Sequence, residues 1–310
     1  APHPAQAEEE FCQLLLSLRS RWPGAVIYPV SDETLVVTAR HRAALERYFS
    51  VACPDYRTVC RVIDKQLTYP LAERGGVAVP RTLIPRSLPE LKKFSAEVIF
   101  PCLLKPSQSH LFFAEFGSKM FMAENPEQLQ DYYLRAAEVG LEVMVQEFIP
   151  GGDGEVVNYN VYAVDGEPRV EFSAEHIRNA PQFFGSPRVA LSAPVPGLAA
   201  SGRKMVKALN YTGYACMEFK RDHRDGQLKL MEVNGRHNLS TLLAVRCGIN
   251  FPWLEYRHLA YGELPEEQSF ENGVYWVDIT RDLAYSARHL LTERYSLQEY
   301  LRPYLKKRVW

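Results

Sequence analysis

The sequence predicts a mixed α/β protein with α+β character, and three observations lead to this fold class. A helix at Phe11–Leu18, a strand at 25–30 and a second helix from Asp32, which could cap it, follow one another in the order expected of an α/β layer. Two pairs of strand-like segments flank the turns Asp165-Gly166 and Asp225-Gly226, and Asp-Gly favours antiparallel hairpins. The 310 residues are 46% hydrophobic, which is enough for a sizeable core.

The other elements follow from periodicity, caps and turn residues. Helices are expected after 60–65, over 126–139, 198–209 and 239–246, and once or twice in the final forty residues. Strands are expected at 98–104, 143–149, 155–164, 168–174, 214–220 and 228–233, and irregular segments at 107–110 and 176–188.

Composition excludes several classes of protein. The charges of the 36 basic and 37 acidic residues nearly cancel, so the net charge does not favour binding to nucleic acid or to anionic lipid. The apolar runs are short and the amino end lacks a signal-peptide pattern, so we expect no membrane segment and a cytoplasmic location. The six cysteines show no CxxC spacing, and we expect free thiols without zinc.

The hairpin around Asp225-Gly226 carries the candidate metal site. Glu218 and Glu232 are each seven residues from Asp225, so they lie opposite each other if the hairpin closes there, and Asn234 shares the face of Glu232. Two carboxylates about 5 Å apart repel each other, which raises one pKa or recruits a cation. Three hard oxygens suit Mg²⁺ better than Zn²⁺. The alternative is a surface hairpin with solvated charges.

Two basic residues near these elements could bind an anion. Lys105 lies at the end of the strand 98–104 beside a small polar loop, where a lysine can meet phosphate as a point charge. Arg236 lies two residues beyond Asn234, where a guanidinium could clamp a phosphoryl or carboxylate oxygen. For Lys105 the alternative is a lysine that is simply solvated.

The order of these features resembles the ATP-grasp superfamily, which includes D-alanine–D-alanine ligase and biotin carboxylase. In family order the sequence has Asp64-Lys65, a Gly-Val-x-Val-Pro-x-Thr stretch from Gly76, Leu104-Lys105-Pro106, the segment 145–151, and Glu218 followed by Glu232-Val233-Asn234-Gly235-Arg236. The match spans about residues 64–261. Its Glu-x-Asn-x-Arg ending is the most specific part.

The resemblance implies a role for each matching position. Lys65 and Lys105 would contact ATP phosphates, Gln146, Glu147 and Phe148 would lie against the adenine, and Glu155 would bind the ribose hydroxyls. Glu218, Glu232 and Asn234 match Mg²⁺ ligands, with Mn²⁺ as an alternative metal. Arg236 matches the basic residue beside the transferred phosphoryl group, and Arg178 is a looser match to an arginine on the far side. Glu147 and Glu155 could instead be strand-edge charges, and Arg178 and His110 could be structural.

The implied architecture is an ATP-grasp fold with an N-terminal Rossmann-like domain that looks truncated, because its glycine-bearing first strand is not found. The expected domains are an N-terminal α/β domain at 1–78, a small ATP-grasp subdomain at 79–150, a large subdomain with the Mg²⁺ site at 151–270 and a helical extension at 271–310. The segment after the second lysine departs from the family, since it has Ser107–His110 and a lone Gly117 where several glycines are usual.

The resemblance implies an ATP-dependent ligase that activates a carboxylate as an acyl phosphate, joins it to an amine and releases ADP and phosphate. Such an enzyme needs no covalent nucleophile, and the sequence has no GxSxG elbow. The partners would be small-molecule carboxylates and amines, and either a homodimer or a larger polypeptide stays open. The alternatives are a kinase-like or carboxylating enzyme and a non-catalytic domain that senses ATP.

Overall fold

The computed structural model describes residues 1–106, 109–118, 120–182, 185–239, 241–289 and 295–309. The chain divides into two compact units: the large unit, Ala1–Ala78 with Gly151–Trp310, and the small unit, Val79–Pro150. The division into four domains stays a prediction. Within the described residues, no helix has both the length and the apolar character that a membrane span requires.

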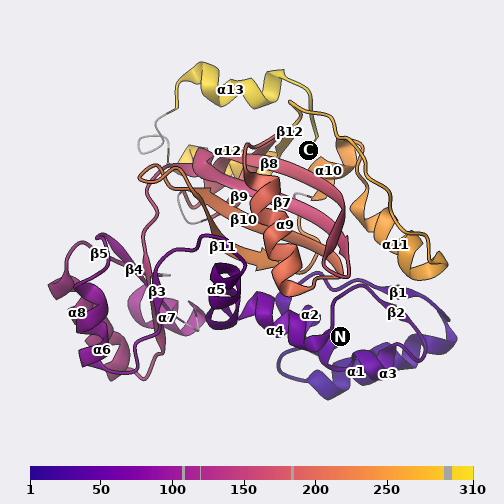
Figure 1. Ribbon diagram of the computed structural model, residues 1–310, viewed down its shortest axis with the longest axis horizontal. Coiled ribbons are helices and arrows are strands. Elements are labelled where there is room, and N and C mark those ends of the chain that lie inside the picture. Colours follow the sequence, from indigo (N-terminus) through magenta and orange to yellow (C-terminus); the bar gives the residue numbers. More distant parts are fainter. Residues whose placement is uncertain (107–108, 119, 183–184, 240, 290–294, 310) are drawn as a thin grey trace. The chain divides into compact units, whose positions relative to one another are not determined.

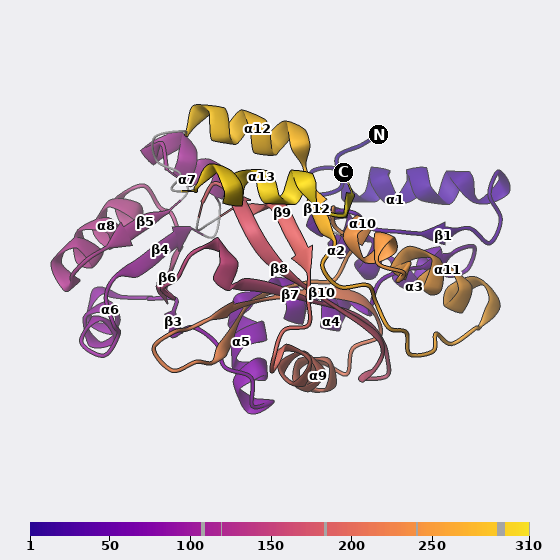
Figure 2. The ribbon, with the colours of Figure 1, turned by 90° about the horizontal axis from the view of Figure 1, so that it is seen from above.

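The small unit is an antiparallel four-stranded sheet in the order β3-β6-β4-β5, with helices beside it. Its strands are β3 (Thr82–Leu83), β4 (Cys102–Pro106), β5 (Phe121–Ala123) and β6 (Val143–Glu147). Its helices are α6 (Leu88–Ser95), α7 (Ser109–Phe116) and α8 (Pro126–Glu138). Helices α6 and α8 lie beside the sheet (Figure 2) and share one buried cluster with its strands, in which Leu91, Leu129 and Val145 take part.

Two boundaries in the small unit differ from the prediction. The strand expected at 98–104 begins only at Cys102, directly after Pro101, whose nitrogen cannot donate to a ladder. The prediction of a loop at 107–110 is wrong from Ser109 onward, because α7 begins at Ser109 and buries Phe112. Ser107 and Gln108 lie outside the described residues. Leu111, Phe112, Phe113 and Phe116 supply the apolar spacing that favours this helix.

The first 78 residues of the large unit form an α/β layer. Its elements are α1 (Glu8–Ser17), η1 (Leu18–Ser20), β1 (Val26–Ile27), α2 (Asp32–Arg40), α3 (Arg42–Leu45), β2 (Ser50–Val51), α4 (Tyr56–Ile63) and α5 (Lys65–Arg74). Strands β1 and β2 are parallel, as expected of such a layer. Ser31, rather than Asp32, caps α2, because its Oγ accepts the Thr34 N–H at 3.2 Å.

The rest of the large unit is built on a seven-stranded sheet in the order β11-β10-β7-β8-β9-β12-β13. The strands are β7 (Val156–Val164), β8 (Glu167–Ala180), β9 (Ser186–Ser192), β10 (Gly213–Arg221), β11 (Leu228–Asn234), β12 (Tyr275–Val277) and β13 (Arg308–Val309). The other elements are η2 (Asp153–Glu155), α9 (Leu198–Leu209), α10 (Thr241–Arg246), α11 (Phe251–Tyr261), α12 (Ile279–Arg288) and α13 (Leu297–Leu305). Both predicted hairpins, β7-β8 and β10-β11, are confirmed as antiparallel pairs.

The two faces of this sheet are covered differently. Helix α9 lies in front of β7, β8 and β10 in Figure 1 and packs so closely that a Cβ at Gly202 would lie 2.3 Å from the Tyr159 ring. On the other face Tyr214 and Cys216 of β10 join a buried cluster with residues of α10 and α11. Side chains alternate between faces along a strand, so Glu218 points to the same side as Tyr214 and Cys216.

The segment expected to be irregular at 176–188 is largely strand, which corrects the prediction. Strand β8 continues to Ala180 and β9 begins at Ser186. Arg178 and Arg188, which lie in this segment, are fully buried and pair with Asp282 of α12 at 2.7 and 2.9 Å. A distant carboxylate therefore lets two charged residues occupy a buried strand position.

The final forty residues contain the expected helices, α12 and α13, and also two strands that the sequence did not predict. Strand β12 pairs antiparallel with β9, and β13 pairs parallel with β12, so this segment extends the sheet. These strands are only three and two residues long, which is too short for a periodic pattern to reveal them.

Candidate functional site

The β10-β11 hairpin has the predicted register at its carboxylates. Glu218 and Glu232 are directly opposite each other, and Asn234 lies opposite Cys216. A β-bulge follows Glu218, because Phe219 pairs with Leu230 and Met231 is left as the extra residue. The hairpin therefore presents two carboxylates and an amide from neighbouring strands.

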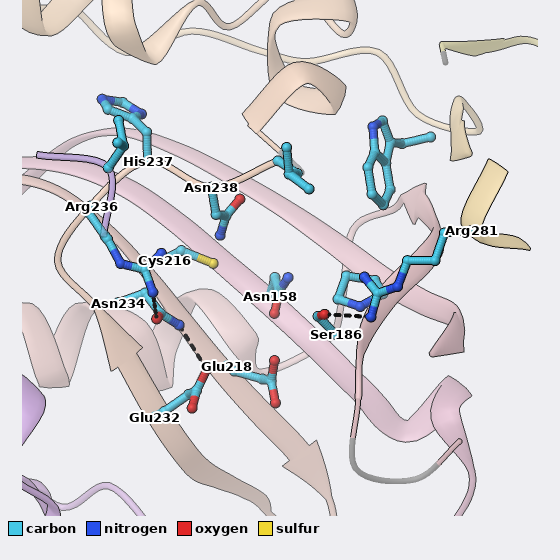
Figure 3. A pocket seen from close by; sticks show the side chains of 14 residues that line it. Asn158, Ser186, Cys216, Glu218, Glu232, Asn234, Arg236, His237, Asn238 and Arg281 are labelled. Atoms are coloured by element: carbon cyan, nitrogen blue, oxygen red, sulfur yellow. Dashed lines mark hydrogen bonds between the residues drawn. The ribbon is translucent and has the colours of Figure 1, made fainter. Parts of the chain in front are cut away.

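These side chains line a cavity of about 500 Å³ (Figure 3). The remaining lining residues come from the segment before α2, from the loop after β11, and from β7, β9, β10, β12 and α12: Val30, Asn158, Ser186, Pro187, Cys216, Arg236, His237, Asn238, Leu239, Trp276 and Arg281. All of them belong to the large unit. Glu218 and Glu232 are only partly buried, so the cavity remains open to a ligand.

A chain of hydrogen bonds fixes the amide and the guanidinium. Asn234 Nδ2 donates to Glu232 Oε1 at 2.9 Å, and Arg236 Nη2 donates to Asn234 Oδ1 at 3.4 Å. Arg236 Nε donates to Asp32 Oδ1 at 2.7 Å. Asp32, at the start of α2, thus orients an arginine that lies 204 positions later in the chain, and no local pattern indicates this contact.

Cys216 also lines the cavity but is unsuited to act as a nucleophile. Burial raises the pKa of its thiol to about 12, and the nearby Glu218 and Glu232 add to the shift while Asn238 and Arg236 oppose it. A thiol with such a pKa is almost fully protonated at neutral pH. The cavity therefore favours chemistry without a covalent enzyme intermediate.

His237 and Arg281 are lining residues that the sequence analysis missed. His237 Nε2 lies 2.8 Å from Oε2 of the buried Glu255, and its ring stacks on Tyr214 with centroids 4.1 Å apart. Arg281 Nη2 donates to Ser186 Oγ at 2.9 Å and to the Ala180 carbonyl at 2.5 Å. The position of His237, directly after the Glu-x-Asn-x-Arg motif, is a signal that could have identified it. Arg281 lies in the final forty residues, for which no site was predicted.

The small unit holds four further predicted residues. Lys105 Nζ donates to Gln146 Oε1 at 2.7 Å, across the pair β4-β6, and Gln146 Nε2 donates to Thr82 Oγ1 at 3.1 Å. Glu147 is buried and accepts the Arg81 N–H at 3.1 Å, and the Phe148 N–H donates to the Pro101 carbonyl at 3.3 Å. The structure thus brings Lys105 and Gln146 into contact.

The other three predicted residues lie in the large unit but not among the described residues that line the cavity. Lys65 is the first residue of α5, which Asp64 caps by accepting the Gln66 N–H at 2.8 Å. Glu155 Oε1 lies 2.9 Å from His223 Nε2. Arg178 is bound to Asp282 in the sheet interior, so the expectation that it faces the phosphoryl group is corrected, because a fully buried and paired guanidinium cannot reach a substrate in the cavity.

The donor set at the hairpin fits a hard divalent cation. Within the described part of the chain no cluster of three or more His, Cys, Asp or Glu could hold a metal alone. Glu218 and Glu232 supply two carboxylates, so amide oxygens and ligand phosphates would have to complete the shell. Mg²⁺ is usually held in this way, by one or two carboxylates together with substrate phosphates.

The chain is similar to several known ATP-grasp proteins. D-aspartate ligase of Enterococcus faecium is 28% identical over 229 residues, which cover 68% of this chain and 53% of that protein. The carbamoyl phosphate synthase large chain of Pyrococcus furiosus is 30% identical over 112 residues, or 36% of this chain and 10% of that protein. The chain thus spans about half the length of the D-aspartate ligase. No family model matches the chain.

Solved structures agree on the fold. The biotin carboxylase domain of Hydrogenobacter thermophilus 2-oxoglutarate carboxylase, solved as a dimer with MgADP, ADP and bicarbonate, has a TM-score of 0.69 at 18% identity and covers 89% of this chain and 62% of that chain. L-amino acid ligase from Bacillus licheniformis has a TM-score of 0.64 at 17% identity and covers 83% and 61%. These relatives are all ATP-grasp proteins.

Proposed function

The chain has the ATP-grasp fold, and from this premise we propose that it is an ATP-dependent carboxylate-amine ligase that releases ADP and phosphate. The observation that carries the proposal is the pair Glu218 and Glu232, which face each other on neighbouring strands of a cavity that also contains Arg236. Relatives named as ligases of D-aspartate and of L-amino acids support an amino acid as one substrate.

In this proposal Glu218, Glu232 and Asn234 hold Mg²⁺, or Mn²⁺ in its place, which offsets charge on the ATP phosphates when it is bound. Arg236 binds the phosphoryl group in transfer, because a guanidinium can donate to two oxygens at once. Its Nε donates to Asp32 and its Nη2 donates to Asn234, so the guanidinium is held beside the proposed metal ligands. The similar structure solved with MgADP supports the choice of nucleotide and metal.

The nucleotide-binding role of the remaining residues also belongs to the proposal. Lys105, Gln146, Glu147 and Phe148 of the small unit and Lys65 and Glu155 of the large unit would bind ATP. We also propose, from the likeness to ATP-grasp proteins, the four-part domain organisation, a cytoplasmic location and no binding of nucleic acid. We further propose that the chain assembles as a homodimer or is part of a larger polypeptide. The dimer of the related biotin carboxylase domain supports the homodimer.

A carboxylating enzyme is the second candidate, and the structural similarity to a domain solved with bicarbonate favours it. The two candidates differ in their substrate requirement. A ligase releases ADP only when an acid and an amine are both supplied, whereas a carboxylating enzyme responds to bicarbonate without an amine. A domain that only senses ATP would release no ADP with either set of substrates. ADP release from this chain across a panel of amino acids, small acids and bicarbonate separates all three.

The decisive test of the ligase is the fate of the carboxylate oxygen. An acyl phosphate made from an ¹⁸O-labelled acid keeps one labelled oxygen on phosphorus when the amine attacks carbon, so the released inorganic phosphate should carry one label. Activation as an adenylate would put the label in AMP. Mass spectrometry of the phosphate and nucleotide products distinguishes the two routes, and unlabelled phosphate from a productive substrate pair would contradict the acyl phosphate.

A further inference from the structure

Asn158 of β7 extends the row of side chains at the metal site onto a third strand. Asn158 is directly opposite Glu218 in the β7-β10 pair, and Glu218 is directly opposite Glu232 in the β10-β11 pair. The three residues therefore lie side by side across neighbouring strands and share one face of the sheet. The same cavity touches all three.

The amide oxygen of Asn158 has no hydrogen-bond partner among the residues that the structure describes. Asn158 is 4% exposed, and its buried Oδ1 accepts no hydrogen bond from any described residue. Figure 3 shows this oxygen on the side of the amide that faces the Glu218 carboxylate. A buried carbonyl oxygen that lacks a partner destabilises a fold, and a neighbouring carboxylate adds repulsion.

A cation would offset both unfavourable effects. Neighbouring strands lie about 4.8 Å apart. At this spacing one oxygen from each strand can bind the same cation at about 2.0–2.6 Å. Asn234 Oδ1 already accepts one hydrogen bond, from Arg236, whereas Asn158 Oδ1 accepts none from a described residue. Asn158 can therefore add a further oxygen ligand to the set formed by Glu218, Glu232 and Asn234.

We infer that Asn158 Oδ1 is a ligand of a divalent cation that it shares with Glu218, so that the cation site spans three strands. The inference rests on the proposed function in one respect, namely that Glu218 and Glu232 bind a divalent cation. It assigns Asn158 a role that the Glu-x-Asn-x-Arg motif does not contain. It predicts that cation affinity depends on a residue sixty positions before Glu218.

The test is Mn²⁺ binding to the full chain, measured by electron paramagnetic resonance with and without ADP. Asn158→Leu keeps the side-chain volume but removes the oxygen, and we expect the Mn²⁺ dissociation constant to rise about tenfold. Asn158→Asp replaces the amide oxygen with a carboxylate, and we expect binding as tight as in the wild type or tighter. Circular dichroism of each variant checks that it is folded.

Asn160 provides the matched control. It is a buried asparagine on the same face of β7, but its Oδ1 accepts the Tyr214 hydroxyl at 2.7 Å and it does not line the cavity. Asn160→Asp also adds a buried carboxylate near the hairpin. Tighter Mn²⁺ binding in Asn158→Asp but not in Asn160→Asp shows that position 158, rather than added charge, is responsible.

Unchanged Mn²⁺ affinity in Asn158→Leu overturns the inference. Weaker binding in Asn158→Asp also overturns it, because that result means the amide nitrogen donates to Glu218 and the new carboxylate repels it. If Asn158→Leu does not fold, the comparison of Asn158→Asp with Asn160→Asp decides alone. Glu218→Gln and Glu232→Gln test the premise separately: if neither weakens Mn²⁺ binding, the proposed cation site itself is wrong.

Discussion

Asp282 is expected to be the most important buried charge for the stability of the large unit. Arg178 donates to it through Nε at 2.9 Å and Nη2 at 2.7 Å, and Arg188 Nη1 lies 2.9 Å from Asp282 Oδ1. The Tyr304 hydroxyl donates to the same carboxylate, and all three charged side chains are at most 1% exposed. One carboxylate therefore compensates two guanidinium groups that water cannot reach.

Asp282→Asn keeps the shape of the side chain but removes its charge. Loss of one partner of a buried pair destabilises proteins by about 3–5 kcal/mol, because the remaining charge stays buried and uncompensated. Two guanidinium groups lose their partner here, so we expect a loss at the upper end, about 5 kcal/mol. Urea unfolding followed by circular dichroism measures it as a shift of the midpoint at constant m-value.

An exposed ion pair in the same unit provides the control. Glu46 pairs with Arg42 at 2.6 Å with both side chains about one third exposed or more, and Glu46→Gln should cost at most about 1 kcal/mol. A loss below about 1 kcal/mol in Asp282→Asn would refute the view that this cluster holds β8, β9 and α12 together. Arg178→Met should likewise lower the free energy of unfolding. If Arg178→Met is instead as stable as the wild type but turns over slowly, Arg178 has a catalytic role.

Three further outcomes are expected. Burial lowers the pKa of His176 from 6.5 to about 4 while Asn179 opposes the shift, so the unfolded chain binds the extra proton between these values. Stability should fall by about 3 kcal/mol as the pH drops through this range. His176→Leu should remove that part of the pH dependence, and an unchanged pH slope would contradict the assignment. Asp32→Ala removes the acceptor of Arg236 Nε and should lower ADP release about tenfold with little change in the KM for ATP. Lower thermal stability with normal turnover would mean that Asp32 is only structural. Glu232→Gln should lower Mg²⁺-dependent turnover at least about 100-fold while the protein remains folded, and unchanged turnover would remove Glu232 from the site.

The hairpin at the site could be predicted from the sequence because its determinants are local. An Asp-Gly turn and two alternating segments placed Glu218 opposite Glu232, and the structure has that pairing. The bulge at Met231 was not predicted, because nothing in the local sequence distinguishes it. Local sequence patterns thus predict the register at the two carboxylates but not the β-bulge next to them.

Contacts between distant residues could not be predicted in this way. The segment 176–188 was predicted to be irregular, whereas its Arg178 and Arg188 lie in buried strands. Charged residues are rarely buried without a partner, and their partner Asp282 lies about a hundred positions later in the chain. Asp32 suggested a helix cap, whereas Ser31 caps α2 and Asp32 binds Arg236. In both cases the partner of the charged residue depends on the tertiary fold, so local sequence patterns cannot predict it.

The position of the candidate site follows from how the sheet is covered. Along β10 the residues on one face change from Tyr214 and Cys216, which are buried in a cluster with α10 and α11, to the partly exposed Glu218. Facing carboxylates inside that cluster would cost several kcal/mol each, so they can occur only where the helices no longer cover the sheet. Their mutual repulsion still destabilises the protein without a ligand, and a bound cation removes it. The same pair that lowers the stability of the unbound protein thus makes cation binding favourable, and a divalent cation should raise the melting temperature of the wild type more than that of Glu232→Gln.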